Sequence, residues 1–383
     1  MNLNIVADEN MPLVEEIFSE FGSVKRVAGR NMSPADVCDA DLLLVRSVSQ
    51  VNELLLAKAS PKFIGTATIG TDHIDTGYLQ QQGIAFSSAP GCNADAVVEY
   101  VLSAIFHLAQ TQGFDPAERT WGIIGVGNVG GRLQKRLRGL GYNVLINDPP
   151  REARGDDGFV TLDQLLSDAD VVCMHTPLTR EGAHPSYHLL SEPELKRLKP
   201  NTILLNAGRG PVINNADLVM LKKRRDDLTL ILDVWEHEPV VDPELAAVTE
   251  IATPHIAGYS HDGKIRGTFM LYEACCQALG IKPTKTLDDF LPEPAIKQVV
   301  VNGDVTALDL IRLRYDPYRD DRDLRRSLHE EAQTRALSFD RLRKQYPQRR
   351  EFSSLQVIGE MDESLRQQAR ALGFKVAADS KIP

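Results

Sequence analysis

A glycine-rich stretch at residues 121–131 constrains the fold more than any other part of the chain. A short apolar run there leads into Gly125, Gly127 and Gly130, which have the spacing G-x-G-x-x-G. A helical pattern follows directly, so the glycines stand between a predicted strand and a predicted helix. In this context the first glycine permits a tight turn, the second lets backbone approach a pyrophosphate, and the third lets the helix pack closely on its strand. The stretch therefore predicts a dinucleotide at the N-terminus of that helix.

An acidic residue at the end of the next apolar run indicates which dinucleotide is bound. Asp148 follows a second predicted strand at residues 144–146. Its carboxylate can accept hydrogen bonds from an adenosine ribose, whereas a 2′-phosphate would be repelled by its charge. The expected cofactor is therefore NAD rather than NADP. The alternative interpretation is a glycine turn in another kind of α/β protein.

Short apolar runs and helical patterns alternate along most of the chain, which is typical of parallel sheets in α/β proteins. A long helical pattern at residues 93–110 leads into the glycine-rich strand and would bridge two domains. Another one after residue 258 would return the chain to the first domain, and Pro283, Pro292 and Pro294 then mark a linker. Strands are expected at residues 3–7, 41–45, 63–65, 84–86, 144–146, 171–174, 202–205 and 228–232, and at the short apolar run 123–124 before the glycines.

The predicted fold class is α/β, with two Rossmann-like or flavodoxin-like parallel-sheet domains, a cleft between them and a small C-terminal α+β domain. The first domain is expected at residues 1–92 plus 259–282, the dinucleotide-binding domain at 93–258 and the C-terminal domain at 283–383. The C-terminal part is dense in both charge signs and contains no motif for chemistry. We interpret its arginine runs as solvated or interfacial faces.

The composition argues against several other classes of protein. The net charge of −10 argues against a general nucleic-acid binder. No apolar run approaches the ~20 residues needed to span a bilayer, and the first residues lack the basic start of a signal peptide. The five cysteines have no metal-ligand spacing and are expected to be reduced thiols. We therefore expect a cytoplasmic protein with no metal, no nucleic-acid partner and no membrane association.

Three short stretches that could carry chemistry follow the dinucleotide motif, each at the end of a predicted strand, where ligands of open α/β sheets bind. In the first, Arg209 lies in a tight glycine turn and could hold a carboxylate with its planar guanidinium. The other two contain Glu238 and His255, and a carboxylate beside a histidine is suited to proton transfer near neutral pH. Taken alone, each has an ordinary alternative: a structural ion pair, a surface acid or a structural histidine.

The order of these stretches, GVGNVG, Asp148, NAGRG, DVWEHEP and TPHIAG, resembles the D-2-hydroxyacid dehydrogenase family over about residues 1–280. The resemblance implies that Arg209 holds the substrate carboxylate and polarises the C2 oxygen. It also implies that His255 takes the C2 hydroxyl proton and that Glu238 supports His255. It places Gly125, Gly127, Asn128, Val129, Gly130, Asp148, Thr176, Ala207, Gly208, Arg209, Asp233 and Gly258 around NAD.

Stretches of the first domain narrow the resemblance to members of the family that oxidise 4-phospho-D-erythronate during pyridoxal phosphate (vitamin B6) synthesis. These stretches are VRSV at 45–48, GTATIGTDH at 65–73 and APGCN at 89–93, together with Gly258-Tyr259. The resemblance implies that Ser47, Thr68 and Tyr259 contact the substrate. It further implies that the C-terminal domain serves homodimerisation.

Arg46 is a separate prediction from the residues themselves. A substrate with a carboxylate and a phosphate needs two cationic sites, and Arg209 can serve only one. Arg46 ends an apolar strand and could serve the other, although an ion pair with a neighbouring acid is the alternative. Two further functions stay open: another D-2-hydroxyacid dehydrogenase, such as one acting on 3-phosphoglycerate, and a nucleotide-sensing protein without turnover.

Overall fold

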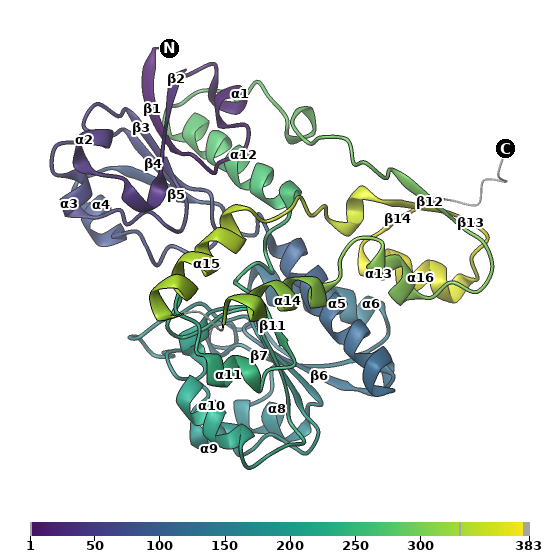
Figure 1. Ribbon diagram of the computed structural model, residues 1–383. Coiled ribbons are helices and arrows are strands. Elements are labelled where there is room, and N and C mark those ends of the chain that lie inside the picture. Colours follow the sequence, from purple (N-terminus) through teal and green to yellow (C-terminus); the bar gives the residue numbers. More distant parts are fainter. Residues whose placement is uncertain (1, 329–330, 378–383) are drawn as a thin grey trace. The chain divides into compact units, whose positions relative to one another are not determined.

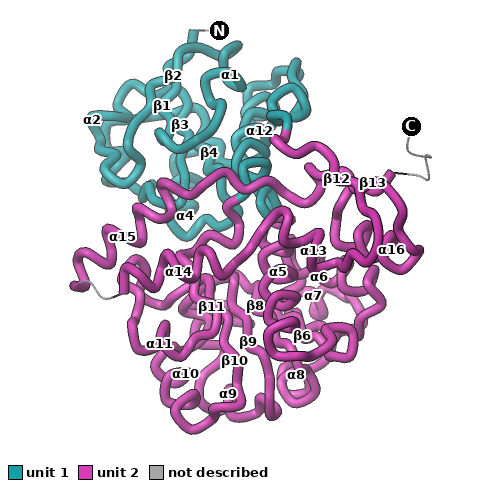
Figure 2. The backbone as a smooth tube through the Cα atoms, turned by 45° about the vertical axis from the view of Figure 1, so that its right-hand side comes forward, with its two compact units in different colours: residues 1–93, 260–293 teal, residues 94–259, 294–383 magenta. Residues whose placement is uncertain are grey.

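The computed structural model describes residues 2–328 and 331–377, and Figure 1 shows its helices and strands. The chain divides into two compact units, coloured teal and magenta in Figure 2. Unit 1 contains Met1–Asn93 and Ser260–Glu293, and unit 2 contains Ala94–Tyr259 and Pro294–Pro383. Each unit is therefore built from two separate stretches of sequence.

Unit 1 is organised around a five-stranded parallel sheet with the strand order β2-β1-β3-β4-β5. Helix α12 covers one face with Phe269, Leu271 and Tyr272, while Leu55 and Leu79 belong to the apolar cluster on the other. Burial on both faces explains why β3 is a short, continuous apolar run and why all four residues of β4 are buried. The strands are β1 Leu3–Asp8, β2 Gly22–Val27, β3 Leu42–Val45, β4 Phe63–Thr66 and β5 Ala85–Ser88. The helices are α1 Val14–Phe18, η1 Gly29–Asn31, α2 Pro34–Val37, α3 Glu53–Leu56, α4 Thr76–Gln81, α12 His261–Ala278 and η4 Leu287–Asp289.

Unit 2 contains a six-stranded parallel sheet with the order β11-β10-β9-β8-β6-β7. One face packs against α5 and α6, and the other packs against α8, α9 and α10, in two separate apolar clusters. The strands are β6 Thr120–Ile124, β7 Asn143–Asn147, β8 Val171–Met174, β9 Ile203–Asn206, β10 Thr229–Leu232 and β11 Ile251–Ala252. The helices are α5 Ala94–Gln112, η2 Pro116–Glu118, α6 Asn128–Gly139, α7 Pro149–Glu152, α8 Leu162–Asp168, α9 Glu192–Leu195, η3 Gly210–Val212, α10 Asn215–Lys222 and α11 Pro243–Ala247.

The C-terminal residues of unit 2 form a small three-stranded parallel sheet, β12-β13-β14. They share the core of the larger sheet, because Phe352 and Phe374 belong to the same apolar cluster as α5 and α6. Leu324 and Phe339 belong to the cluster on the opposite face. These elements are β12 Gln298–Val301, α13 Ala307–Arg312, α14 Pro317–Ser327, α15 Ala332–Lys344, η5 Phe352–Ser354, β13 Gln356–Gly359, α16 Glu363–Leu372 and β14 Lys375–Val376.

The predicted fold class is confirmed, since both large sheets are parallel and a small C-terminal sheet follows them. The division into three domains at residues 92, 258 and 282 stays a prediction. Among the described residues, no helix combines the length and the hydropathy that crossing a bilayer requires.

Candidate active site

The glycine turn between β6 and α6 is closely packed at two of its three glycines. Gly125 has a φ of 86°, and a Cβ there would lie 2.8 Å from the backbone nitrogen of Thr176. A Cβ on Gly130 would lie 2.0 Å from the carbonyl oxygen of Gly125, so no side chain fits. Above Gly127, by contrast, a Cβ would meet no atom within 4 Å. The turn is thus compact and leaves open space at the start of α6, where a phosphate would meet backbone N–H groups.

Asp148 is tied to this turn by its side chain. One carboxylate oxygen accepts a hydrogen bond from the Val126 backbone nitrogen at 2.7 Å. The other accepts one from the Arg151 nitrogen at 3.0 Å and caps α7. These two bonds hold the carboxylate at the glycine turn, and each oxygen keeps a lone pair for a ribose hydroxyl.

Two polar side chains beside the turn are shielded from water without a partner among the described residues. They are the Thr176 hydroxyl and both ring nitrogens of His175. Buried polar groups are normally hydrogen-bonded, so unsatisfied ones at a predicted ligand site are consistent with a missing ligand. Burial lowers the pKa of His175 to about 4, which keeps its ring neutral near pH 7. Together with the open space at Gly127, these residues fit a dinucleotide.

Arg209 follows β9 in a turn that the preceding residues hold in place. The Asn206 side chain donates to the Arg209 carbonyl oxygen at 2.9 Å and accepts from the Gly208 nitrogen at 3.0 Å. A Cβ on Gly210 would overlap the backbone of Trp235, at 2.0 Å from its carbonyl carbon. This glycine therefore lets the turn that carries Arg209 lie directly against the segment that leads to Glu238.

Glu238 and His255 form the hydrogen-bonded pair that the sequence predicts. Nδ1 of His255 lies 2.7 Å from one Glu238 carboxylate oxygen, and the other oxygen accepts from the Trp235 nitrogen at 2.9 Å. Burial alone would raise the pKa of Glu238, but the charge and hydrogen bond of His255 outweigh it, so the pKa is lowered below 4.5. The His255 side chain keeps 30% of its surface accessible, as a group that exchanges protons with a ligand requires.

Asp233 holds the loop that carries His255. Its carboxylate, in a residue only 1% exposed, accepts hydrogen bonds from the Thr253 hydroxyl and from the nitrogens of Ile256 and Ala257. The His255 nitrogen donates to the Asp233 carbonyl oxygen at 2.7 Å. His255 has a φ of 55°, a left-handed conformation that costs free energy in a residue with a side chain. The bonds to Asp233 hold the loop in this conformation, whereas a contact of Asp233 with NAD stays a prediction.

The substrate residues predicted in unit 1 lie at the ends of β3 and β4. The Thr68 hydroxyl donates to the Gly70 carbonyl oxygen at 2.9 Å, so it is already hydrogen-bonded, and Ser47 is exposed. An Arg46 guanidinium nitrogen lies 3.5 Å from the Asn10 carbonyl oxygen, and no carboxylate of the described residues forms an ion pair with Arg46. The ion-pair alternative for Arg46 therefore finds no support in this part of the chain.

Arg343 of α15 is a residue near the pair of Glu238 and His255 that sequence reasoning missed. Its guanidinium carbon lies 5.5 Å from the centre of the Tyr259 ring, and its charge helps to lower the pKa of Glu238. The dense charges of the C-terminal part of the chain indicated solvated or interfacial faces. The spacing of arginines in a sequence does not show which of them are buried in the fold. Only the fold brings α15 to Tyr259.

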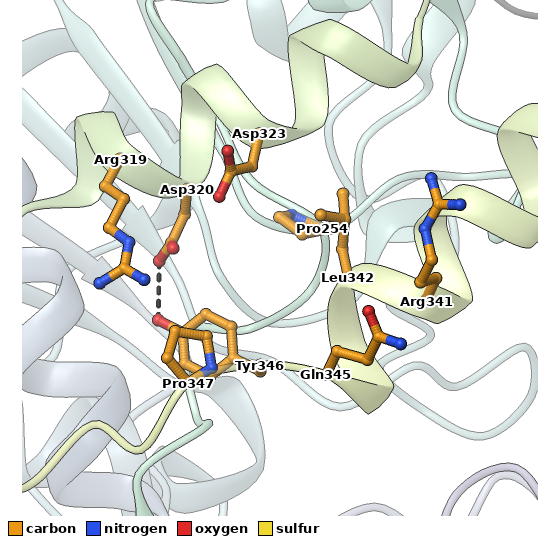
Figure 3. Close-up of a pocket in the computed structure, with 9 residues that line it drawn as sticks. All are labelled: Pro254, Arg319, Asp320, Asp323, Arg341, Leu342, Gln345, Tyr346 and Pro347. Atoms are coloured by element: carbon orange, nitrogen blue, oxygen red, sulfur yellow. Dashed lines mark hydrogen bonds between the residues drawn. The ribbon is translucent and has the colours of Figure 1, made fainter.

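A separate cavity of 260 Å³ lies along α14 and α15 (Figure 3). Pro254, next to His255 in sequence, contributes to its wall, but Arg209, Glu238 and His255 do not. Asp320 accepts a hydrogen bond from the Tyr346 hydroxyl there at 2.7 Å. Among the described residues, no group of histidine, cysteine and acidic side chains has the arrangement of a metal site.

Two family models match this chain. One describes the NAD binding domain of D-isomer specific 2-hydroxyacid dehydrogenases and matches residues 99–257. The other describes a domain of unknown function and matches residues 290–373. The cofactor is therefore NAD, as the glycine turn and Asp148 predict.

Solved structures confirm the fold. The 3-phosphoglycerate dehydrogenase of Entamoeba histolytica with bound NAD+ superposes with a TM-score of 0.62 at 24% identity, covering 73% of this chain and 96% of its own. The D-lactate dehydrogenase of Aquifex aeolicus, complexed with NAD and lactic acid, gives 0.57 at 24% identity, with coverages of 72% and 96%.

Full-length relatives are more similar. The erythronate-4-phosphate dehydrogenase of Ectopseudomonas mendocina is 50% identical over 376 residues, which cover 97% of this chain and 99% of the relative. The enzyme of the same name from Azotobacter vinelandii is 50% identical over 377 residues, with coverages of 97% and 99%. The chain therefore belongs to the erythronate-4-phosphate dehydrogenase family, within the NAD-dependent D-2-hydroxyacid dehydrogenases.

Proposed function

We propose that this protein oxidises 4-phospho-D-erythronate at C2 with NAD, giving 2-oxo-3-hydroxy-4-phosphobutanoate for pyridoxal phosphate (vitamin B6) synthesis. The observation that carries the proposal is the hydrogen-bonded pair of His255 and Glu238 at the strand ends of the NAD-binding unit. We infer the substrate from the names of relatives that match almost the whole chain. Neither another hydroxyacid nor a role without turnover is favoured by any observation on this chain.

Arg209 binds the substrate carboxylate in this proposal. A guanidinium presents parallel N–H donors that match a carboxylate, and its charge also polarises the adjacent C2 oxygen. The hydrogen bonds of Asn206 hold the turn, so that the charge lies at a fixed place at the end of β9. This positioning lowers the entropy lost when the substrate reaches a reactive geometry.

His255 removes the proton of the C2 hydroxyl. Because Nδ1 donates to Glu238, the neutral ring carries its lone pair on Nε2, which can accept that proton. The Glu238 carboxylate then stabilises the imidazolium that forms. NAD, when held at the glycine turn and Asp148, would supply the acceptor for the hydride that leaves C2.

The remaining site residues keep their predicted roles as proposals, Arg46 from the charge of the substrate and the others from the motifs and the family resemblance. For substrate these are Arg46, Ser47, Thr68 and Tyr259. For NAD they are Gly125, Gly127, Asn128, Val129, Gly130, Asp148, Thr176, Ala207, Gly208, Arg209, Asp233 and Gly258.

The proposal is tested by following NADH fluorescence with 4-phosphoerythronate, with 3-phosphoglycerate as the competing substrate. We expect turnover of the first at a much higher kcat/KM than of the second. His255→Ala and Arg209→Ala should each lower kcat/KM by about 10²-fold or more, while NADH still binds. Near-normal kcat in both variants would contradict the assigned roles.

A homodimer and a cytoplasmic location are also proposed. No disulfide joins any of the five cysteines, all of which lie in the described residues, and this suits a reducing compartment. Sedimentation of the full chain should give twice the 42.4 kDa of one copy. A sedimenting mass of one copy at micromolar concentration would contradict the dimer.

A further inference from the structure

Arg343 has an unusual environment for a charged residue on a C-terminal helix. Its guanidinium carbon lies 5.5 Å from the centre of the Tyr259 ring and 5.6 Å from that of Phe339, so it sits between two aromatic faces. Its Nε atom is shielded from solvent and has no hydrogen-bond partner in the described part of the chain. A shielded donor on a charged group costs free energy unless a ligand satisfies it.

The charge of Arg343 reaches the catalytic pair. Burial would lower the pKa of Arg343, but the neighbouring Tyr259 and Glu238 raise it above its usual value. The side chain therefore stays cationic, close to a tyrosine predicted to touch the substrate and to the carboxylate that supports His255. Although Glu238 attracts it, no carboxylate of the described residues lies within ion-pair distance of Arg343.

The substrate in the proposed function carries two anionic groups. A carboxylate adjoins the reacting carbon, where Arg209 and His255 are assigned, and a phosphate lies two carbons beyond it. The guanidinium of Arg343, 5.5 Å from the centre of the Tyr259 ring, is a second cation that can supply the complementary charge for a phosphate.

We propose that Arg343 binds the phosphate of the substrate, so that the C-terminal part of unit 2 determines specificity for a phosphorylated hydroxy acid. The inference rests on the proposed function. It assigns a role to residues 290–373, which match a domain of unknown function and lie outside the matched NAD-binding domain.

The decisive comparison uses 4-phosphoerythronate and erythronate with the variants Arg343→Met and Arg343→Lys. For Arg343→Met, kcat/KM with the phosphorylated substrate should fall about 10- to 100-fold, the usual effect of losing a hydrogen bond to a charged group. With erythronate, kcat/KM should fall much less, because that substrate has no phosphate contact to lose. Arg343→Lys should lie in between, because an ammonium keeps the charge without the planar fork. Competitive inhibition by inorganic phosphate should weaken in the same order.

Arg341→Met is the matched control. Arg341 lies two residues away on α15, is exposed, and donates to the Ser338 hydroxyl at 3.0 Å. It lines the cavity along α14 and α15, as Figure 3 shows. Its removal should leave both substrates and phosphate inhibition unchanged. Arg46→Met, measured in parallel, shows whether the arginine of unit 1 contributes to the same phosphate preference.

An equal loss with both substrates would overturn the proposal and leave Arg343 as a positioning residue for Tyr259 and Glu238. Unchanged inhibition by phosphate in both Arg343 variants would also overturn it. If Arg343→Met did not fold, judged by its melting temperature and NADH binding, Arg343→Lys and Arg343→Gln would decide by the same two readouts. Absence of turnover of 4-phosphoerythronate by the unaltered protein would contradict the proposed function instead.

Discussion

Glu238 combines a structural and an electrostatic role in one side chain. One oxygen accepts from the backbone at Trp235, and the other holds Nδ1 of His255. A glutamine at this position would keep the size of the side chain and lose its charge. The imidazolium formed during oxidation would then have no anion beside it, so the barrier to proton transfer would rise.

We expect Glu238→Gln to lower kcat at pH 7 by about 10- to 100-fold with little change in NADH binding. A stopped assay of NADH formation and a fluorescence titration of NADH measure the two quantities separately. A parallel loss of NADH affinity would indicate a distorted fold rather than a lost charge.

The lowered pKa of Glu238 also predicts how the stability of the protein depends on pH. The folded state lowers the pKa of Glu238 below 4.5, so ionisation of this group favours folding. That stabilisation is present above the unfolded pKa and is lost as the pH falls through the lowered folded pKa. The melting temperature of the unaltered protein should therefore exceed that of Glu238→Gln at pH 7, and the difference should shrink below about pH 4.5. A difference that stayed constant down to pH 3 would contradict the assignment.

At the scale of the element, substitutions at two neighbouring glycines of α6 are predicted to have opposite effects on stability. A Cβ on Gly130 would overlap the Gly125 carbonyl oxygen at 2.0 Å, while one on Gly131 would meet only the Val126 carbonyl oxygen at 3.6 Å. Gly130→Ala should separate α6 from β6, destabilise the fold by about 1–3 kcal/mol and weaken NADH binding. Gly131→Ala should keep NADH binding and raise stability by about 0.5–1 kcal/mol, because alanine is the better helix former. Thermal melts and NADH titrations of both variants check this contrast.

Elements with strong local patterns were predictable. The run through β6, Gly125 and α6 follows its motif, and Ser33 begins α2 with a capping box, a local pattern of the same kind. The strand β2 was not predicted, because it is an edge strand of unit 1 and alternates partly buried with exposed residues, including Lys25 and Arg26. Its weak apolar pattern gives no periodic signal, and only its pairing with β1 defines it.

The chemistry of the site was predictable where residues share a motif with their neighbours in sequence. Arg209, Glu238 and His255 lie in such motifs, and the pairing of the last two is observed. Arg343 could not be found this way, because its significance comes from a contact with Tyr259, 84 residues earlier in the chain. A charged helix has the same sequence pattern whether its arginines face solvent or a ligand.

At the scale of the whole molecule, the C-terminal residues stabilise the NAD-binding sheet. The ring of Phe352 stacks on that of Phe374 with centroids 4.6 Å apart, and the Phe352 nitrogen donates to Glu99 of α5 at 2.8 Å. Phe352→Ala should therefore cost about 3–5 kcal/mol. Leu337→Ala, at a residue 66% exposed, should cost less than about 0.5 kcal/mol.

The chain itself provides the measurement for this prediction. Both tryptophans, Trp121 and Trp235, lie in the sheet region of unit 2, so their fluorescence reports on that region during denaturation. The midpoint seen by the tryptophans should fall in Phe352→Ala although the substitution lies far away in sequence. An unchanged midpoint would mean that the C-terminal residues fold independently of the sheet.

The interleaving of the two units also dictates an order of folding during synthesis. Unit 1 lacks the helix that covers one face of its sheet until residues 261–278 have been translated. Unit 2 lacks part of its core until Phe374 has emerged from the ribosome. The first 93 residues therefore remain partly uncovered while residues 94–259 are translated, so nascent chains of intermediate length should be protease-sensitive and bind chaperones. A gene built in this way couples completion of the core of the cofactor-binding unit to translation of Phe374.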